Sequence, residues 1–235
     1  MKPIGVVDSG APLLQAPWLV EQRRFVMCHG KVVNEAVVED VLGHGSAVLQ
    51  TIQYHCPQAR FVNAQVLDGQ GRCQVEQLAA ALEWMLALGV EHVHLSVGLR
   101  RNDDALRALC QRFFDENKIL VASCPAMGEA VFPANYPGVF SATGDARCAI
   151  GEWSWFQGYH LAEYGAQVRA VDGRLGSSMA AAHLSGVIAA AVKQQGVRGR
   201  EAVERYLQAN AHRQGAQKRE PLRAPNSTQS KQEIS

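Results

Sequence analysis

The chain has 235 residues, of which 47% are hydrophobic, and its 23 Lys and Arg residues nearly balance its 22 Asp and Glu residues. A chain of this length and composition can bury one sizeable core, so we expect a single domain. The even charge balance creates no broad positive field, which argues against nucleic acid and anionic membranes as partners. No stretch reaches the roughly 18 apolar residues that a membrane span requires.

The start of the chain and its cysteines bear on the compartment. Residues 1–8 run straight into a candidate strand, and no apolar run is followed by a small-residue cleavage site. The six cysteines are scattered without paired spacing. Without a secretory signal, such thiols are expected to be reduced rather than joined in a disulfide framework. We therefore expect a cytoplasmic protein.

Strands and helices alternate over the first half of the chain. The apolar run 4–7 predicts a strand that ends at Asp8, and residues 43–52 predict a helix that Pro57 closes. The other predicted elements here are strand 25–28, strand 61–67, helix 75–88, strand 92–97, helix 102–117 and strand 119–122. This alternation predicts an α/β fold, in which a mostly parallel sheet is the middle of a three-layer sandwich.

The second half of the chain is less regular. Residues 139–143 predict a strand, a long helix begins at Gly176, and a last helix covers about 200–210. From residue 211 onward the chain is rich in Gln, Ser, Pro and charge, and cannot bury enough surface to order itself. We expect a folded domain over residues 1–210 and a disordered tail over residues 211–235.

The segment Gly176–His183 has two interpretations. Taken alone, it is best explained as an Ala-rich core helix that Ser177 or Ser178 caps. The alternative is that Ser178 is a nucleophile. In an open parallel sheet, reactive groups collect where strands end and helices begin, and Asp8 and His44 both occupy such junctions.

Asp8, His44 and Ser178 together are the residue types of a nucleophile relay. A serine hydroxyl attacks only weakly unless an imidazole accepts its proton, and the imidazole needs a carboxylate that orients it. The order Asp, His, Ser along the chain is one of the known orders of such relays. Either Asp8 or His44 alone would be interpreted as an ordinary junction residue.

Five segments resemble motifs of the subtilases, the subtilisin-like serine peptidases. They lie in the order of that family and at roughly its spacing. The segments are Val6–Gly10, Gly43–Ile52, Leu95–Gly98, Phe132–Val139 and Gly176–His183. The resemblance implies a subtilisin-like fold in a compact intracellular form without a prodomain. It also implies that Asp8 orients His44, that His44 acts as general base and then acid, and that Ser178 attacks the acyl carbon.

The resemblance also implies where a substrate binds. An extended peptide would add as a strand beside Ser96, Val97 and Gly98. Ala126 stands where the family places an Asn whose side chain donates to the oxyanion. Alanine has no such donor, and losing it costs about 10² to 10³ in turnover, a magnitude measured in subtilisin itself. The backbone N–H of Ser178 remains as a donor.

We expect no cofactor and no metal. Cys28-His29 and His55-Cys56 lack second pairs at ligand spacing. His92 and His94 alternate on one strand face, which is more typical of a satisfied strand pair than of a ligand pair.

Two classes of function remain. The first is an intracellular serine endopeptidase that hydrolyses, or transacylates, a peptide bond of a dedicated peptide or protein through an acyl-enzyme on Ser178. The second is a pseudopeptidase, a peptide-binding module with weak or no turnover because Ala126 replaces the oxyanion Asn. We favour the first, because an intact triad is otherwise hard to explain. The expected partner is a peptide or protein substrate, and a further partner protein is left open.

Overall fold

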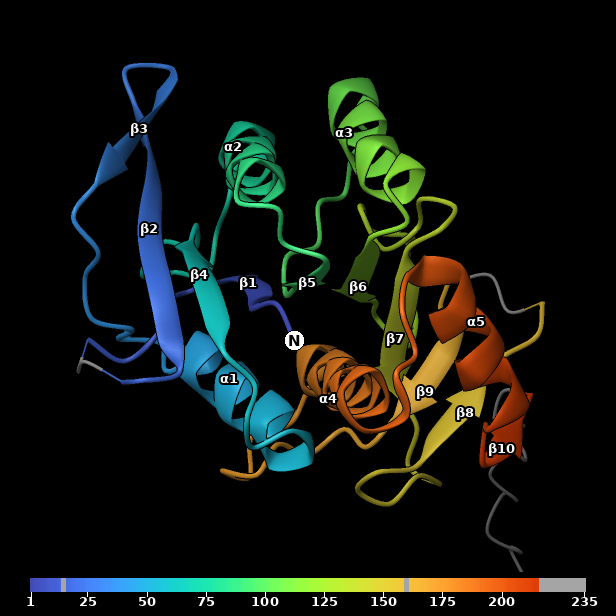
Figure 1. Ribbon diagram of the computed structural model, residues 1–235. Helices are drawn as coiled ribbons and strands as arrows, with labels where there is room; N and C mark the ends of the chain where they lie inside the picture. Colours follow the sequence, from blue (N-terminus) through green and yellow to red (C-terminus); the bar gives the residue numbers. More distant parts are fainter. Residues whose placement is uncertain (14–15, 159–160, 216–235) are drawn as a thin grey trace, which may run out of the picture.

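The computed structural model describes residues 1–13, 16–158 and 161–215, which form one ten-stranded sheet flanked by five helices (Figure 1). The strands are β1 (Ile4–Asp8), β2 (Leu19–Cys28), β3 (Lys31–Glu35), β4 (Phe61–Gln65), β5 (His92–Leu95), β6 (Ile119–Ser123), β7 (Phe140–Gly144), β8 (Trp153–Trp155), β9 (Tyr164–Ala166) and β10 (Arg213–Gln214). The helices are α1 (His44–His55), α2 (Val75–Ala87), α3 (Asp104–Asp115), α4 (Ser177–Gln195) and α5 (Arg200–Ala209).

The sheet is mostly parallel. Its strand order is β10-β8-β9-β7-β6-β5-β1-β4-β2-β3, and only the pairs β2–β3 and β8–β9 among the described strands are antiparallel. Strand β1 lies near the middle, between β5 and β4. The predicted α/β fold with a mostly parallel sheet is therefore confirmed, and the carboxyl ends of the central strands meet at one edge.

Helices cover both faces of the sheet, as Figure 1 shows, with α2 and α3 on one face and α1, α4 and α5 on the other. Successive side chains of a strand point to opposite faces. On β1, Val7 packs toward α2 and α3, whereas Ile4 and Val6 pack toward α1 and α4. Asp8 follows the same alternation, so its carboxyl group points to the face where α1 begins. No helix in the described part of the chain is long and apolar enough to cross a bilayer.

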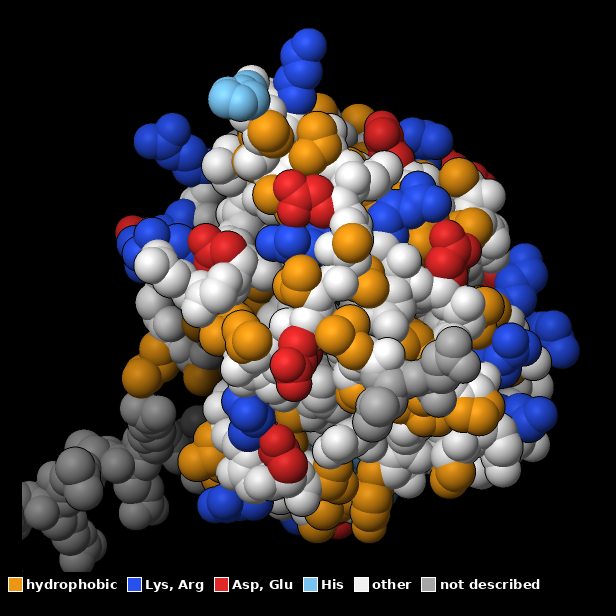
Figure 2. All heavy atoms as spheres, turned by 90° about the vertical axis from the view of Figure 1, so that its left-hand side faces the viewer, with side chains coloured by type: hydrophobic (Ala, Val, Ile, Leu, Met, Phe, Trp, Pro, Cys, Tyr) orange, Lys and Arg blue, Asp and Glu red, His pale blue; other side chains and the backbone are white. Residues whose placement is uncertain are grey.

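Several strands were predicted only in part or not at all. Of the β2–β3 hairpin, residues 25–28 were predicted, whereas residues 19–24 and the whole of β3 were not. The hairpin β2–β3 forms one edge of the sheet, where charged and apolar side chains are interspersed (Figure 2). Its polar sequence hides the strand pattern, because an edge hairpin buries little of its surface. Strands β8 and β9 have three residues each, too few for a period to be recognised.

Strand β10 lies beyond the predicted boundary at residue 210. Strand β10 pairs in parallel with β8, and the Gly215 N–H donates to the carbonyl of Trp155 at 2.9 Å. The Arg147 side chain donates to the Gly215 carbonyl at 2.8 Å. Hydrogen bonds from distant residues, together with packing of Ala211 and of His212 against Trp153, therefore order residues 211–215, which composition could not reveal. The rest of the predicted tail, residues 216–235, lies outside the described residues.

Candidate active site

Asp8 and His44 form a buried pair at the carboxyl edge of the sheet. Asp8 is the last residue of β1 and His44 the first of α1. The Asp8 Oδ1 atom lies 2.8 Å from Nδ1 of His44 and also accepts the Ser9 N–H at 2.6 Å. The Asp8 side chain is 0% exposed, whereas that of His44 is 30% exposed. The bonded Nδ1 leaves Nε2 as the imidazole nitrogen that is available for proton transfer.

A close contact between two backbones sets this pairing. A Cβ atom on Gly45 would lie 2.1 Å from the carbonyl oxygen of Gly10, which no side chain can tolerate. The Gly45 N–H donates to Oγ of Ser9 at 3.0 Å. Glycine at position 45 therefore lets the first turn of α1 rest against the turn that follows β1, which brings His44 to Asp8.

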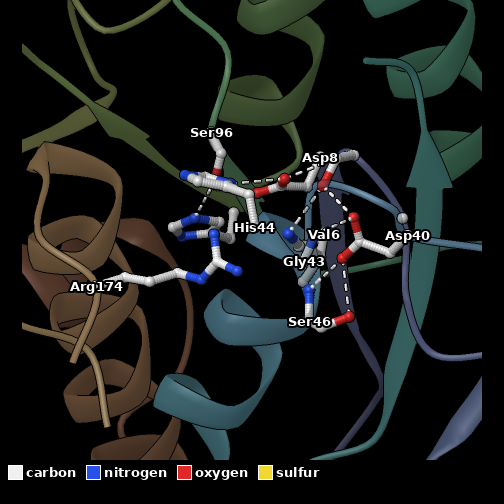
Figure 3. A network of polar contacts seen from close by, with 12 residues as sticks. Val6, Asp8, Asp40, Gly43, His44, Ser46, Ser96 and Arg174 are labelled. Carbon is white, nitrogen blue, oxygen red and sulfur yellow. Dashed lines mark hydrogen bonds and ion pairs between the residues drawn. The ribbon is translucent and has the colours of Figure 1, made fainter. Parts of the chain in front are cut away.

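Asp40 is a second buried carboxylate, which the sequence analysis missed (Figure 3). Its Oδ1 accepts the Ser9 hydroxyl at 2.7 Å and the Gly43 N–H at 3.0 Å. Its Oδ2 accepts both the N–H and the hydroxyl of Ser46, each at 2.8 Å. A carboxylate just before a predicted helix start was the available signal, because negative charge stabilises a helix N-terminus.

The charges around the pair set its proton affinity. Burial alone would raise the pKa of Asp8, but the hydrogen bond and charge of His44, with the Ser96 hydroxyl and the Ser9 N–H, hold it below its usual value. Burial alone would lower the pKa of His44, but Asp8, together with the charge of Asp40, raises it. The pair thus combines a carboxyl group of lowered pKa with an imidazole of raised pKa, which strengthens the imidazole as a base.

Arg174 acts on His44 in the opposite direction. Its guanidinium reaches toward the start of α1, where a Cβ atom on Gly43 would lie 2.7 Å from Nη2 (Figure 3). The positive charge of Arg174 lowers the pKa of His44. The Arg174 side chain is 46% exposed and pairs with Asp172 at 2.9 Å, so solvent weakens its influence.

Ser178 lies in the first turn of α4 and is half-buried. Helices α1 and α4 pack together, since Ala47 and Val48 share one buried cluster with Met179 and Ala182. No hydrogen bond between His44 and Ser178 occurs within the described part of the chain. The structure therefore joins Asp8 to His44 and places Ser178 on the adjacent helix, without the contact that completes a triad.

The residues expected to bind substrate lie at the same edge of the sheet. Ser96 is half-buried and Gly98 is exposed, whereas the Val97 side chain is buried in the core. Beyond Gly98, the backbones of Leu99 and Phe132 exchange two hydrogen bonds of 2.8 Å. The binding role of these residues stays a prediction.

Ala126 lies in the exposed loop that follows β6. Strand β6 pairs with β5, so this loop leaves the sheet on the same edge as Ser96 and Gly98. The methyl side chain of Ala126 cannot donate a hydrogen bond, so position 126 offers no side-chain donor to an oxyanion.

The other titratable groups of the described residues are the remaining candidates for a metal site. In the described ranges, no group of three or more His, Cys, Asp or Glu side chains could hold an ion. His94 has hydrogen bonds on both ring nitrogens, as expected of a satisfied strand histidine. For His92 that expectation is wrong, because its buried Nε2 has no hydrogen-bond partner among the described residues.

No protein-family model and no curated protein matches the sequence. Solved structures match it by fold. A cold-adapted subtilisin-like serine proteinase superimposes with a TM-score of 0.67 at 18% identity, over 88% of this chain and 81% of that one. A psychrophilic protease gives a TM-score of 0.66 at 16% identity, over 88% of this chain and 82% of that one. The chain thus has a subtilisin-like fold, as the sequence motifs implied.

Proposed function

We propose that this protein is a serine endopeptidase that cleaves a peptide bond through an acyl-enzyme on Ser178. The observation that carries the proposal is the buried Asp8–His44 pair, whose oxygen and nitrogen lie 2.8 Å apart. A fully buried carboxylate is costly unless it is paired, and here the pair holds an imidazole at the start of a helix that packs on α4. Orientation of a general base toward Ser178 accounts for that cost.

Each residue then has a defined step. Nδ1–H of His44 donates to Asp8, and Nε2 accepts the Ser178 proton as Oγ bonds to the carbonyl carbon of the substrate. The tetrahedral intermediate collapses when His44 returns the proton to the amine, which leaves as the peptide bond breaks. Water then attacks the ester in the same way, with His44 again as the base, and releases the acid and free Ser178. An amine in place of water would give transacylation.

Oxyanion stabilisation is the weak point of this site. The Ser178 N–H, at the positive end of α4, is the donor that the chain supplies, and Ala126 adds none. Turnover is therefore slow on general peptides, and we propose a dedicated peptide or protein substrate whose own binding energy compensates. We also propose a cytoplasmic location, which the six free cysteines support because disulfides are rare in a reducing compartment.

A second candidate function rests on the nucleophile side of the site. The side chain of Ala126 offers no donor, and no hydrogen bond joins His44 to Ser178 in the described structure. A pseudopeptidase that binds a peptide without cleaving it would have these features. We favour the peptidase, because a binding module gains nothing from a buried charge that orients an imidazole.

The experiment that separates the two uses a fluorophosphonate probe, which reacts only with an activated serine. We expect labelling of the purified protein and its loss in Ser178→Ala and in His44→Ala. Ser177→Ala is the matched control and should label like the parent protein. No labelling of the parent protein would support the pseudopeptidase, and labelling that survives in Ser178→Ala would place the nucleophile elsewhere.

A further inference from the structure

A second chain of hydrogen bonds lies behind Asp8, on the α1 and α4 face of the sheet. His94, on β5, is 0% exposed. Its Nε2 lies 2.8 Å from Oγ of Ser96, and its Nδ1 lies 3.0 Å from Oγ of Ser185. Ser185 is on α4, the helix that begins with Ser177 and Ser178. His94 thus connects the strand beside Asp8 to the helix of the proposed nucleophile.

Ser96 is the neighbour of Asp8 across two paired strands. Strands β1 and β5 run parallel with Val7 opposite Leu95, and the Ser96 N–H donates to the Val7 carbonyl at 3.2 Å. The next residues, Asp8 and Ser96, therefore lie side by side and point to the same face. The nearby Ser96 hydroxyl is one of the causes that hold the pKa of Asp8 low.

Where the Ser96 proton goes depends on the tautomer of His94. Burial lowers the pKa of His94 to about 4, so its ring is neutral at pH 7 and carries one N–H. If Nδ1 holds that proton and donates it to Ser185, Ser96 must donate to Nε2 and has none left for Asp8. If Nε2 holds it and donates to Ser96, the Ser185 hydroxyl can donate to Nδ1, and the Ser96 proton is available to Asp8.

The desolvation cost of the Asp8 carboxylate favours one of these two His94 tautomers. Its Oδ2 is buried and has no hydrogen-bond partner in the described part of the chain. A buried carboxylate oxygen without a donor carries a large desolvation cost. The arrangement that directs the Ser96 proton to Asp8 removes that cost, whereas the other leaves it in full.

We propose that His94 is a positioning residue, whose Nε2–H holds the Ser96 hydroxyl so that Ser96 donates to Asp8, with Ser185 fixing the tautomer. This inference rests on the proposed roles of Asp8 and His44. It adds a residue that contacts neither substrate nor reacting atoms. It also predicts that a change at position 94 reaches His44 only through Ser96 and Asp8.

The test is an NMR titration of the His44 ring, which needs no turnover. The matched variants are His94→Gln, whose amide reaches Ser96, and His94→Asn, which is one methylene shorter. We expect His94→Asn to raise the pKa of His44 by about half a pH unit, because Asp8 with one donor fewer holds the imidazolium more strongly. Ser96→Ala should give the same rise, and His94→Gln should titrate like the parent protein. The charges of Asp8, Asp40 and Arg174 are unchanged throughout.

The double variant His94→Asn with Ser96→Ala should titrate like Ser96→Ala alone, since His94 acts through Ser96. Equal shifts in His94→Asn and His94→Gln would overturn the donor role. A shift in Ser96→Ala without one in His94→Asn would overturn the link to Ser96. If thermal unfolding shows that the His94 variants do not fold, Ser185→Ala replaces them. Ser185→Ala should raise the pKa of His44 by a smaller amount. If that pKa does not rise, the proposed Nε2–H tautomer of His94 is refuted.

The titration and the probe experiment can fail separately. If the parent protein is not labelled by the fluorophosphonate but the His44 pKa shifts as expected in the variants, the peptidase is refuted and the positioning role of His94 is kept. If the parent protein is labelled but the His44 pKa does not shift in the variants, the peptidase is kept and the positioning role of His94 is refuted.

Discussion

The two halves of the candidate site differ in how firmly the fold holds them. On the proton-transfer half, Asp8 and His44 are bonded to each other, and Asp40 fixes the turn before α1 through four hydrogen bonds. On the acyl-transfer half, Ser178 is half-buried and Ala126 is exposed. In the proposed mechanism, the fold thus preorganises the base, and leaves the oxyanion to one backbone N–H and whatever the substrate brings.

The difference matters because both halves contribute on the same scale. A positioned general base is worth about 10² to 10⁴ in rate. A single oxyanion donor is worth about 10² to 10³. A site with one half complete therefore retains much of its catalytic power and is limited by the other half. Each of the following substitutions weakens or strengthens one half of the candidate site, and the measurement shows how much that half contributes.

Asp8→Asn should have the largest effect. The amide can donate to Nδ1 of His44, so it favours the tautomer that cannot accept the Ser178 proton at Nε2, and kcat should fall by about 10⁴. Steady-state hydrolysis of a peptide substrate measures the change. Asp68→Asn, at an exposed turn, is the control and should leave kcat unchanged. A loss of less than tenfold in Asp8→Asn would mean that the carboxylate does not orient the base.

Ala126→Asn tests the acyl-transfer half. If the missing amide limits turnover, kcat should rise by about 10² with little change in KM, because the new bond forms mainly in the transition state. The control is Ala130→Asn, in the same loop, which should have no effect. An unchanged or lower kcat in Ala126→Asn would show that another donor already serves the oxyanion.

The elements of the proton-transfer half could be predicted, because their signals are local. The apolar run before Asp8 and the glycines around His44 predict a strand end and a helix start, and both occur as β1 and α1. What could not be predicted is the contact between Gly10 and Gly45, since it joins two turns that are distant in sequence. The hydrogen bonds of Asp40 could not be predicted either, because a carboxylate in a loop accepts them only once the helix has folded against it.

The acyl-transfer half depends more on tertiary structure. The α4 helix was predicted from its spacing, but the distance between Ser178 and His44 depends on how α1 and α4 pack. Strand β10 shows the same limitation, since residues 213–214 are ordered by contacts with distant residues, namely backbone pairing with β8 and the bonds of the Arg213 side chain to Arg147 and Glu152. Sequence patterns thus identify elements well and contacts between elements poorly.

Gly45→Ala tests the backbone contact that holds the proton-transfer half. The added methyl group would lie 2.1 Å from the Gly10 carbonyl, so the backbone must shift, and the free energy of unfolding should fall by about 1 to 3 kcal/mol. Urea denaturation measures the change. Gly69→Ala has no atom within 4 Å of its Cβ and should be nearly neutral. Equal stabilities of the two variants would show that α1 does not depend on this contact.

Arg174→Met should have the smallest effect and should separate charge from geometry. Because Arg174 lowers the pKa of His44, its removal should raise that pKa by a few tenths of a unit, about what a screened, half-exposed charge contributes. The acid limb of kcat/KM then moves to higher pH, since His44 must be neutral to act as a base. The shift should shrink at about 1 M salt, where the Debye length is about 3 Å. Arg169→Met is the control and should leave the profile in place. A shift that persists at high salt would mean that Arg174 acts by holding the start of α1 rather than by its charge.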